Sequence, residues 1–149
     1  MSKIKLDYTG FLDYVPVTAA TVTTSWYPGN VGNLNDGDLQ VYSSGQALYI
    51  IIDAPTELVN PPTGKLVTVM HGQGKLQVIP DDVNDWSHVF VGPLADWACN
   101  DAVYVTNAGL LTQAYNASPD ASSGSLQVGK VVDPPTADNA YTLTMIVTL

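Results

Sequence analysis

The sequence predicts an all-β fold: a single-domain β-sandwich or small barrel with a polar N-terminal arm and little helix. Short runs rich in β-branched and aromatic residues recur along the chain, and Gly, Pro, Asn and Asp separate them. Twelve glycines and ten prolines supply the breaks, and no helical segment is long enough to organise a fold. The length of 149 residues suits one domain with one core.

The N-terminal quarter looks different from the rest. "KIKLDY" (3–8) alternates only weakly, whereas 15–27 is rich in Val and Thr and reads as a strand. Segment 27–38 holds three Gly, three Asn and two Asp, with only Val31 and Leu34 as apolar anchors, which is typical of a loop. We therefore expect residues 1–38 to form an arm and loop, and 39–149 to form the core.

Nine strands are expected in the core, over 39–44, 47–53, 65–71, 75–80, 88–92, 102–106, 110–115, 126–132 and 141–149. Two hairpins are expected, with turns at Gly72-Gln73-Gly74 and at Asn107-Ala108-Gly109, because Gly and Asn tolerate positive φ. Segment 80–86 is a candidate for a short helix, since Pro80 and acidic residues stand at its start.

The charge balance excludes several classes of partner. Fourteen acidic residues stand against five basic ones, a formal net charge of −9, and all five basic residues are lysines. Nucleic-acid binding needs cations against phosphates, and an anionic membrane surface needs them too, so we expect neither as a partner. The N-terminus shows no apolar signal-peptide core, and no stretch approaches 18 apolar residues.

Residues that carry chemistry are sparse, so we expect neither a cofactor nor enzymatic activity. There is no Gly-x-Ser-x-Gly motif, Cys99 is the only cysteine, and His71 and His88 are too few for a zinc site. The sharpest enzymatic hint is Asp82 and Asp96 near tryptophans, as in a small glycosidase. The alternative is that these acids begin a helix and that the tryptophans anchor the core.

The last third of the chain, "NDAVYVTNAGLLTQAYNASPDASSGSLQVGKVVDPPTADNAYTLTMIVTL" (100–149), resembles the closing half of the capsid decoration (cement) proteins of tailed bacteriophages. The matching positions are Val103, Tyr104, Val105, Gly109, Thr112, Val128, Gly129 and the strand 141–149. Many relatives continue with an Ala-rich turn, where this chain has Lys130 and Asp133-Pro134-Pro135. The resemblance implies a non-catalytic homotrimer on the capsid exterior that binds the major capsid protein and carries a polar N-terminal arm.

Candidate interface residues come from three places. Alternation in 141–149 directs Tyr141, Leu143, Met145, Val147 and Leu149 to the core, and Thr142, Thr144, Ile146 and Thr148 to a contact surface. Lys3 and Lys5 suit an acidic rim on a partner, and Trp26 and Tyr27 supply large contact area. The predicted interface residues are Lys3, Lys5, Trp26, Tyr27, Thr144, Ile146 and Thr148.

The leading hypothesis is a virion protein that decorates and stabilises the outer surface of a phage capsid. The alternative is a carbohydrate- or receptor-binding β-module of a phage tail or fibre. Trp86, Trp97 and Tyr104 would then form its sugar platform.

Overall fold

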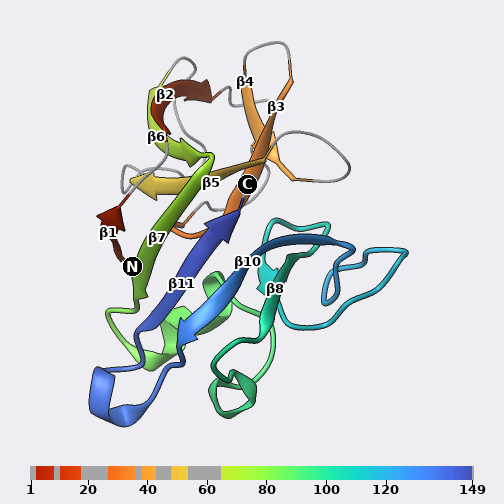
Figure 1. Cartoon of the computed structure of the whole chain (residues 1–149). Helices are drawn as coiled ribbons and strands as arrows, with labels where there is room; N and C mark the ends of the chain where they lie inside the picture. Colours follow the sequence, from red (N-terminus) through yellow and green to blue (C-terminus); the bar gives the residue numbers. More distant parts are fainter. Residues whose placement is uncertain are drawn as a thin grey trace.

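The computed structural model describes residues 3–8, 11–17, 27–35, 38–42, 48–53 and 65–148, and within them the fold is all-β, as predicted (Figure 1). Two antiparallel sheets contain the strands. Sheet A has the order β1 (Lys3–Tyr8), β7 (Gln73–Ile79), β11 (Leu143–Thr148), β10 (Leu126–Asp133), β8 (Ala102–Val105), β9 (Leu111–Thr112). Sheet B has the order β2 (Phe11–Val17), β6 (Lys65–His71), β5 (Leu48–Asp53), β3 (Val31–Asn35), β4 (Asp38–Val41).

Helix is confined, in the described part of the chain, to three short 3-10 turns: η1 (Val83–His88), η2 (Leu94–Asp96) and η3 (Ala137–Asn139). The expected helix start at 80–86 corresponds to η1. Asp82 caps it by accepting from the Asn84 amide, and Asp85 closes a capping box. The expected strand at 88–92 is reduced to one bridge between Phe90 and Leu111. None of these helices is long and apolar enough to cross a membrane.

The hairpin predicted at Gly72 is wrong. β6 pairs with β2 and β5 in sheet B, whereas β7 pairs with β1 and β11 in sheet A. The two strands form one bent ribbon that passes from one sheet to the other (Figure 1). Gly72 has φ +84°, which any other residue adopts only with strain, so here the glycine makes a bend between sheets and the chain does not reverse.

The hairpin predicted at residues 107–109 is confirmed. β8 and β9 pair antiparallel, and the Thr106 amide donates to the Leu110 carbonyl at 2.8 Å across the turn. The returning strand is shorter than predicted, covering only Leu111 and Thr112 of 110–115.

The predicted arm is also wrong over its described residues. β1 forms the edge of sheet A, with Lys3 opposite Ile79 and Lys5 opposite Gln77, and its Ile4 and Leu6 pack against the core. β2 pairs with β6 along its whole length, and β3 occupies 31–35 inside the expected loop. The segments of β1 and β3 have weak local strand signals, and pairing with distant strands overrides them.

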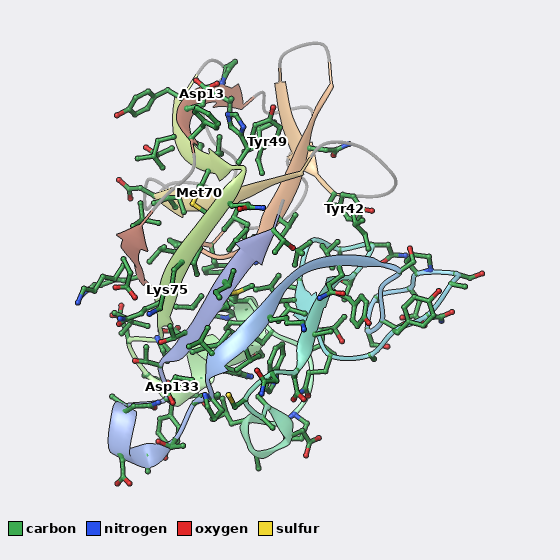
Figure 2. All side chains as sticks on the ribbon, viewed as in Figure 1. Asp13, Tyr42, Tyr49, Met70, Lys75 and Asp133 are labelled. Carbon is green, nitrogen blue, oxygen red and sulfur yellow. The ribbon has the colours of Figure 1, made fainter. Side chains whose placement is uncertain are left out.

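One apolar cluster joins the two sheets. Ile50 and Met70 contribute from sheet B, and Leu76 and Met145 contribute from sheet A; Met70 is labelled in Figure 2. Residues after β7 close one end of this cluster with three aromatic side chains, Trp86, Phe90 and Trp97. The cluster includes residues 31 to 147, which supports the prediction of a single domain.

Candidate functional site: the outer face of sheet A

The strands of sheet A have one buried face and one exposed face. In β11, Leu143, Met145 and Val147 are fully buried, while Ile146 is 39% exposed and Thr148 is exposed. The predicted division of this strand is therefore confirmed at these five positions. It is wrong at Thr144, which was expected on the contact surface but is only 9% exposed, and Leu149 lies outside the described residues. Tyr141 differs: it precedes the strand, has φ +59°, and is 36% exposed, so it does not belong to the core.

The register across sheet A gathers distant residues beside Ile146. Directly opposite partners in antiparallel strands point to the same side of a sheet. Ile146 lies between Lys75 on β7 and Lys130 on β10. We call the outer face the exposed side of this sheet, comprising Lys3, Lys5, Asp7, Lys75, Gln77, Lys130, Ile146 and Thr148.

The outer face is locally basic on a chain of net charge −9, because it holds four of the five lysines. Asp7 accepts from the Gln77 amide at 3.3 Å, and its other carboxylate oxygen lies 3.9 Å from the Lys75 ammonium. Lys3 pairs with Asp81 at 3.6 Å. Lys5 and Lys130 have no carboxylate within 4.0 Å among the residues that the structure describes.

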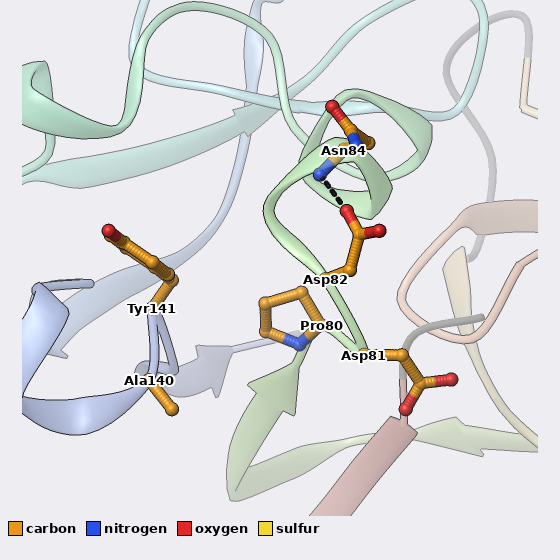
Figure 3. Close-up of a pocket in the computed structure, with 6 residues that line it drawn as sticks. All are labelled: Pro80, Asp81, Asp82, Asn84, Ala140 and Tyr141. Atoms are coloured by element: carbon orange, nitrogen blue, oxygen red, sulfur yellow. Dashed lines mark hydrogen bonds between the residues drawn. The ribbon is translucent and has the colours of Figure 1, made fainter.

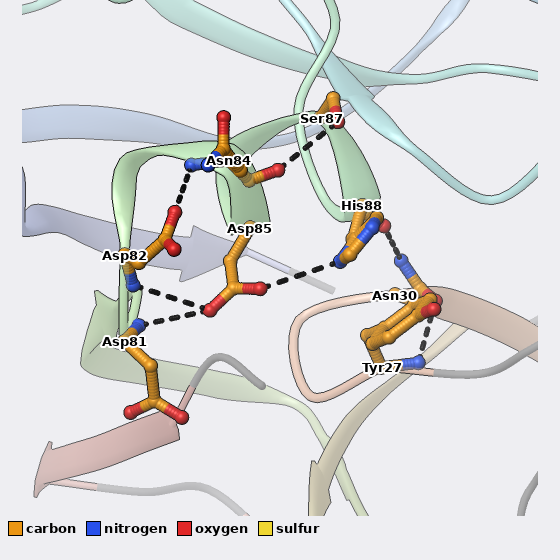
Figure 4. Close-up of polar contacts among 8 residues, drawn as sticks. All are labelled: Tyr27, Asn30, Asp81, Asp82, Asn84, Asp85, Ser87 and His88. Atoms are coloured by element: carbon orange, nitrogen blue, oxygen red, sulfur yellow. Dashed lines mark hydrogen bonds and ion pairs between the residues drawn. The ribbon is translucent and has the colours of Figure 1, made fainter.

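Four of the seven predicted interface residues are exposed on this face: Lys3, Lys5, Ile146 and Thr148. Thr144 lies on the same side of β11 but is buried. Tyr27 does not join them, because its ring stacks on His88 with centroids 4.2 Å apart (Figure 4). Trp26 lies outside the described residues. Lys75, Gln77 and Lys130 were missed, because only the pairing of strands far apart in sequence places them there.

Figure 4 shows that Tyr27 belongs to a structural network. The Asn30 side chain accepts from the Tyr27 amide and donates to the His88 carbonyl, both at 2.8 Å. Asp85 lies 3.6 Å from the His88 ring nitrogen and also accepts from the backbone amide of Asp82. These contacts hold residues 27–30, which precede β3, against η1.

The proposed sugar platform is not assembled. Trp86 and Trp97 are only 5% and 3% exposed, and both pack on Phe90, at centroid distances of 4.0 and 5.2 Å. They are core anchors. Of the three platform residues only Tyr104 reaches the surface, where its ring lies 5.5 Å from that of Tyr115.

The acid pair considered for a glycosidase is not assembled either. Asp82 lines a hollow with Asp81 and Tyr141 (Figure 3), whereas Asp96 lines another with Gln113. The described residues also contain no group of three or more His, Cys, Asp or Glu placed to hold a metal ion.

Comparisons with known proteins found no matching family model, no matching curated protein and no matching solved structure.

Proposed function

We propose that this chain is a structural virion protein that decorates and stabilises the outer surface of a bacteriophage capsid. In this proposal it has no catalytic role, and its partner is the major capsid protein. The segment that resembles decoration proteins, 100–149, supplies four adjacent strands of sheet A, in the order β11-β10-β8-β9. It thus contributes a contiguous part of one sheet.

The observation that carries the proposal is the composition of the outer face. Its lysines, its glutamine and Thr148 surround one central apolar side chain, Ile146, which is 39% exposed. A protein interface typically has an apolar centre that loses its water and a polar rim that stays wet. A surface of this kind remains soluble before assembly and contributes binding energy afterwards.

The remaining parts of the proposal follow from charge and from the family resemblance. We propose that the protein is a homotrimer on the capsid exterior, without nucleic-acid or membrane partners. A net charge of −9 with no arginine opposes binding to phosphates.

Co-sedimentation with empty shells of the major capsid protein encoded in the same genome tests the proposal. The wild-type protein should pellet with the shells, and Ile146→Asp should pellet about tenfold less at equal concentration, because it places a charge at the apolar centre. Leu126→Asp is the matched control. Leu126 is also 39% exposed on β10, but its partner Val105 is buried, so it lies on the other side of the sheet. Failure of wild-type protein to pellet contradicts the proposal.

A second candidate function rests on Tyr104 and Tyr115. Tyr115 is 64% exposed beside Tyr104, and exposed paired rings suit stacking against a sugar. Binding to a glycan array that Tyr115→Ala abolishes would favour this carbohydrate-binding function over decoration.

A further inference from the structure

Two tyrosines form an accessible aromatic pair at one end of the outer face. Tyr104 lies on β8 and is half-buried, while Tyr115 follows β9 and is 64% exposed. Their ring centroids are 5.5 Å apart, with the planes inclined by 59°. Val103 and Val105, the neighbours of Tyr104 on β8, are both buried in the core, so the Tyr104 side chain points to the outer side of sheet A. We call these two residues the tyrosine pair.

The register of sheet A places a cation beside the tyrosine pair. Lys130 on β10 lies opposite Ala102, which is two residues from Tyr104 on β8. Diagonal neighbours of this kind are about 7–8 Å apart in an antiparallel pair, within reach of a long side chain. Lys130 is exposed, and no carboxylate of the described residues lies within 4.0 Å of its ammonium group. Its charge is therefore available to a ligand that also contacts the rings.

A second lysine continues the line across the sheet. Lys75 on β7 and Lys130 on β10 both face Ile146 on β11, which lies between them. Two strand spacings, about 10 Å, therefore separate the two lysines. The strands β7, β11, β10 and β8 are neighbours in that order (Figure 1), so the tyrosine pair and both cations lie along one path over the outer face.

We infer that this end of the outer face binds an acidic glycan. One sugar ring would stack on the tyrosine pair, and a carboxylate of that sugar or of the next would accept hydrogen bonds from the Lys130 ammonium. This inference rests on the carbohydrate-binding candidate above only in placing a sugar on the tyrosine pair. It adds the acidic group of the ligand and the residue that binds this group.

The charge distribution favours a glycan over a nucleic acid, which also has rings to stack and anions to pair. The outer face holds four lysines and one carboxylate, Asp7, on a chain of net charge −9, so the rest of the molecule is more acidic still. A nucleic-acid strand carries a phosphate about every 3.4 Å and would meet this acidic surface beyond the lysines. A short glycan with carboxylates on some of its sugars matches a site with one or two cations.

A glycan array tests the inference with the full chain at low ionic strength. The array carries uronic-acid and sialic-acid oligosaccharides, each beside the same oligosaccharide with its carboxylates reduced to alcohols. Wild-type protein should bind at least one acidic form roughly threefold more tightly than its reduced form, because a partly exposed ion pair contributes modestly. Lys130→Gln should abolish this preference, and Tyr115→Ala should weaken both forms roughly fivefold through the lost stacking.

Two matched variants serve as controls. Lys3→Gln makes the same charge change on β1, at the opposite edge of sheet A, and should keep the preference for acidic forms. Lys130→Arg retains the cation and should keep it too. Lys130 and Tyr115 are exposed, so thermal unfolding of their variants should match that of wild-type protein.

Several results would overturn the inference. These are no binding to any acidic oligosaccharide, equal binding of acidic and reduced forms, or a preference that survives Lys130→Gln. Displacement of the glycan by an equal concentration of a single-stranded DNA oligonucleotide would also overturn it, because the site would then bind anions and rings of any kind.

The same experiment separates the inference from the proposed functions. Pelleting with shells by a protein without a preference for acidic glycans would refute the inference and leave decoration standing. Equal binding of acidic and reduced forms would leave carbohydrate binding standing and refute only the role of Lys130. A preference that Lys130→Gln abolishes, in a protein that does not pellet with shells, would support the inference and contradict decoration.

Discussion

The two sheets bury their strands in different ways. In sheet A burial alternates along β11: Met145 is fully buried and its neighbour Ile146 is 39% exposed. In the central strands β5 and β6 of sheet B it does not alternate, since the neighbours Ile50 and Ile51 are 1% and 0% exposed, and Val69 and Met70 are both 0% exposed. The main core cluster contains Ile50 and Met70 but neither Ile51 nor Val69, which lie on the opposite face of sheet B.

This difference shows where a binding surface can form. A sheet with one solvated face reads as alternating apolar and polar residues, and that face is free to recognise a partner. Strands buried on both faces read as a continuous apolar run, as in "YIII" of β5. Only the central strands of sheet B are buried in this way, since its edge strand β2 exposes Phe11, Leu12 and Tyr14. Sheet B therefore anchors the structure, and sheet A carries the candidate surface.

The comparison between the two sheets is tested most strongly by introducing an aspartate at neighbouring positions of each sheet. Met145→Asp, Ile50→Asp and Ile51→Asp should each lower the free energy of unfolding by roughly 4 kcal/mol, because each buries an unpaired carboxylate. Urea denaturation followed by circular dichroism measures this. If Ile51→Asp is tolerated while Ile50→Asp is not, sheet B has a solvated face and the comparison fails.

Gly129 tests how closely the strands of sheet A must approach. A Cβ at this position would lie 2.1 Å from the Ile146 carbonyl oxygen and 2.9 Å from the Met145 methyl group. Gly129→Ala should therefore cost about 2–3 kcal/mol through overpacking and strand separation. Gly92→Ala is the control: it meets no atom within 4 Å but has φ +89°, so it should cost only about 1–2 kcal/mol of backbone strain. If thermal unfolding shows that the two variants lose equal stability, the strands around Gly129 must move apart enough to accommodate the added methyl group.

The exposed side of sheet A should tolerate an introduced carboxylate, whereas its buried side should not. Ile146→Asp should change the free energy of unfolding by less than about 0.5 kcal/mol, because the carboxylate stays in water. Thermal unfolding beside Met145→Asp measures the contrast. Unfolding of the Ile146 variant would mean that the outer face is covered.

Apart from Thr144, the sequence predicts which residues of β11 in sheet A are buried, but it does not predict which residues of other strands lie beside them. The faces of β11 follow from alternation because water solvates one of its sides. Lys75 and Lys130 could not be placed beside Ile146, because register between distant strands leaves no local signal.

The errors have a common origin as well. A Gly-x-Gly between two apolar runs is compatible with a turn and with a bend, and only the partners of β6 and β7 decide between them. Gly32 and Asn33 look like loop residues, yet pairing with both β4 and β5 makes them a central strand. Where two distant strands decide the structure of a third, a reading of local sequence fails.

The smallest expected effect concerns a loop attached to sheet A. The Ser122 amide donates to the Asp120 carboxylate at 2.8 Å, and the hydroxyl and amide of Ser123 donate to the same oxygen. These hydrogen bonds lower the pKa of Asp120 below its ordinary value of 3.8, and the bond from the Ser122 amide has the largest effect. Since the pKa is lower in the folded state, the stabilisation is fully present above the ordinary value and is lost as the pH falls through the lowered one.

Amide hydrogen exchange at Ser122 and Ser123 checks this directly. In wild-type protein their protection, relative to the global exchange rate, should fall as the pH is lowered through the folded pKa, which lies below 3.8. Asp120→Asn should remove the pH dependence, because an amide does not titrate in this range. Asp138→Asn alters an exposed carboxylate on η3 and should leave the profile unchanged. Protection lost in parallel across β11 would mean that acid opens the whole of sheet A, because Met145 and its buried neighbours would then exchange together with the loop.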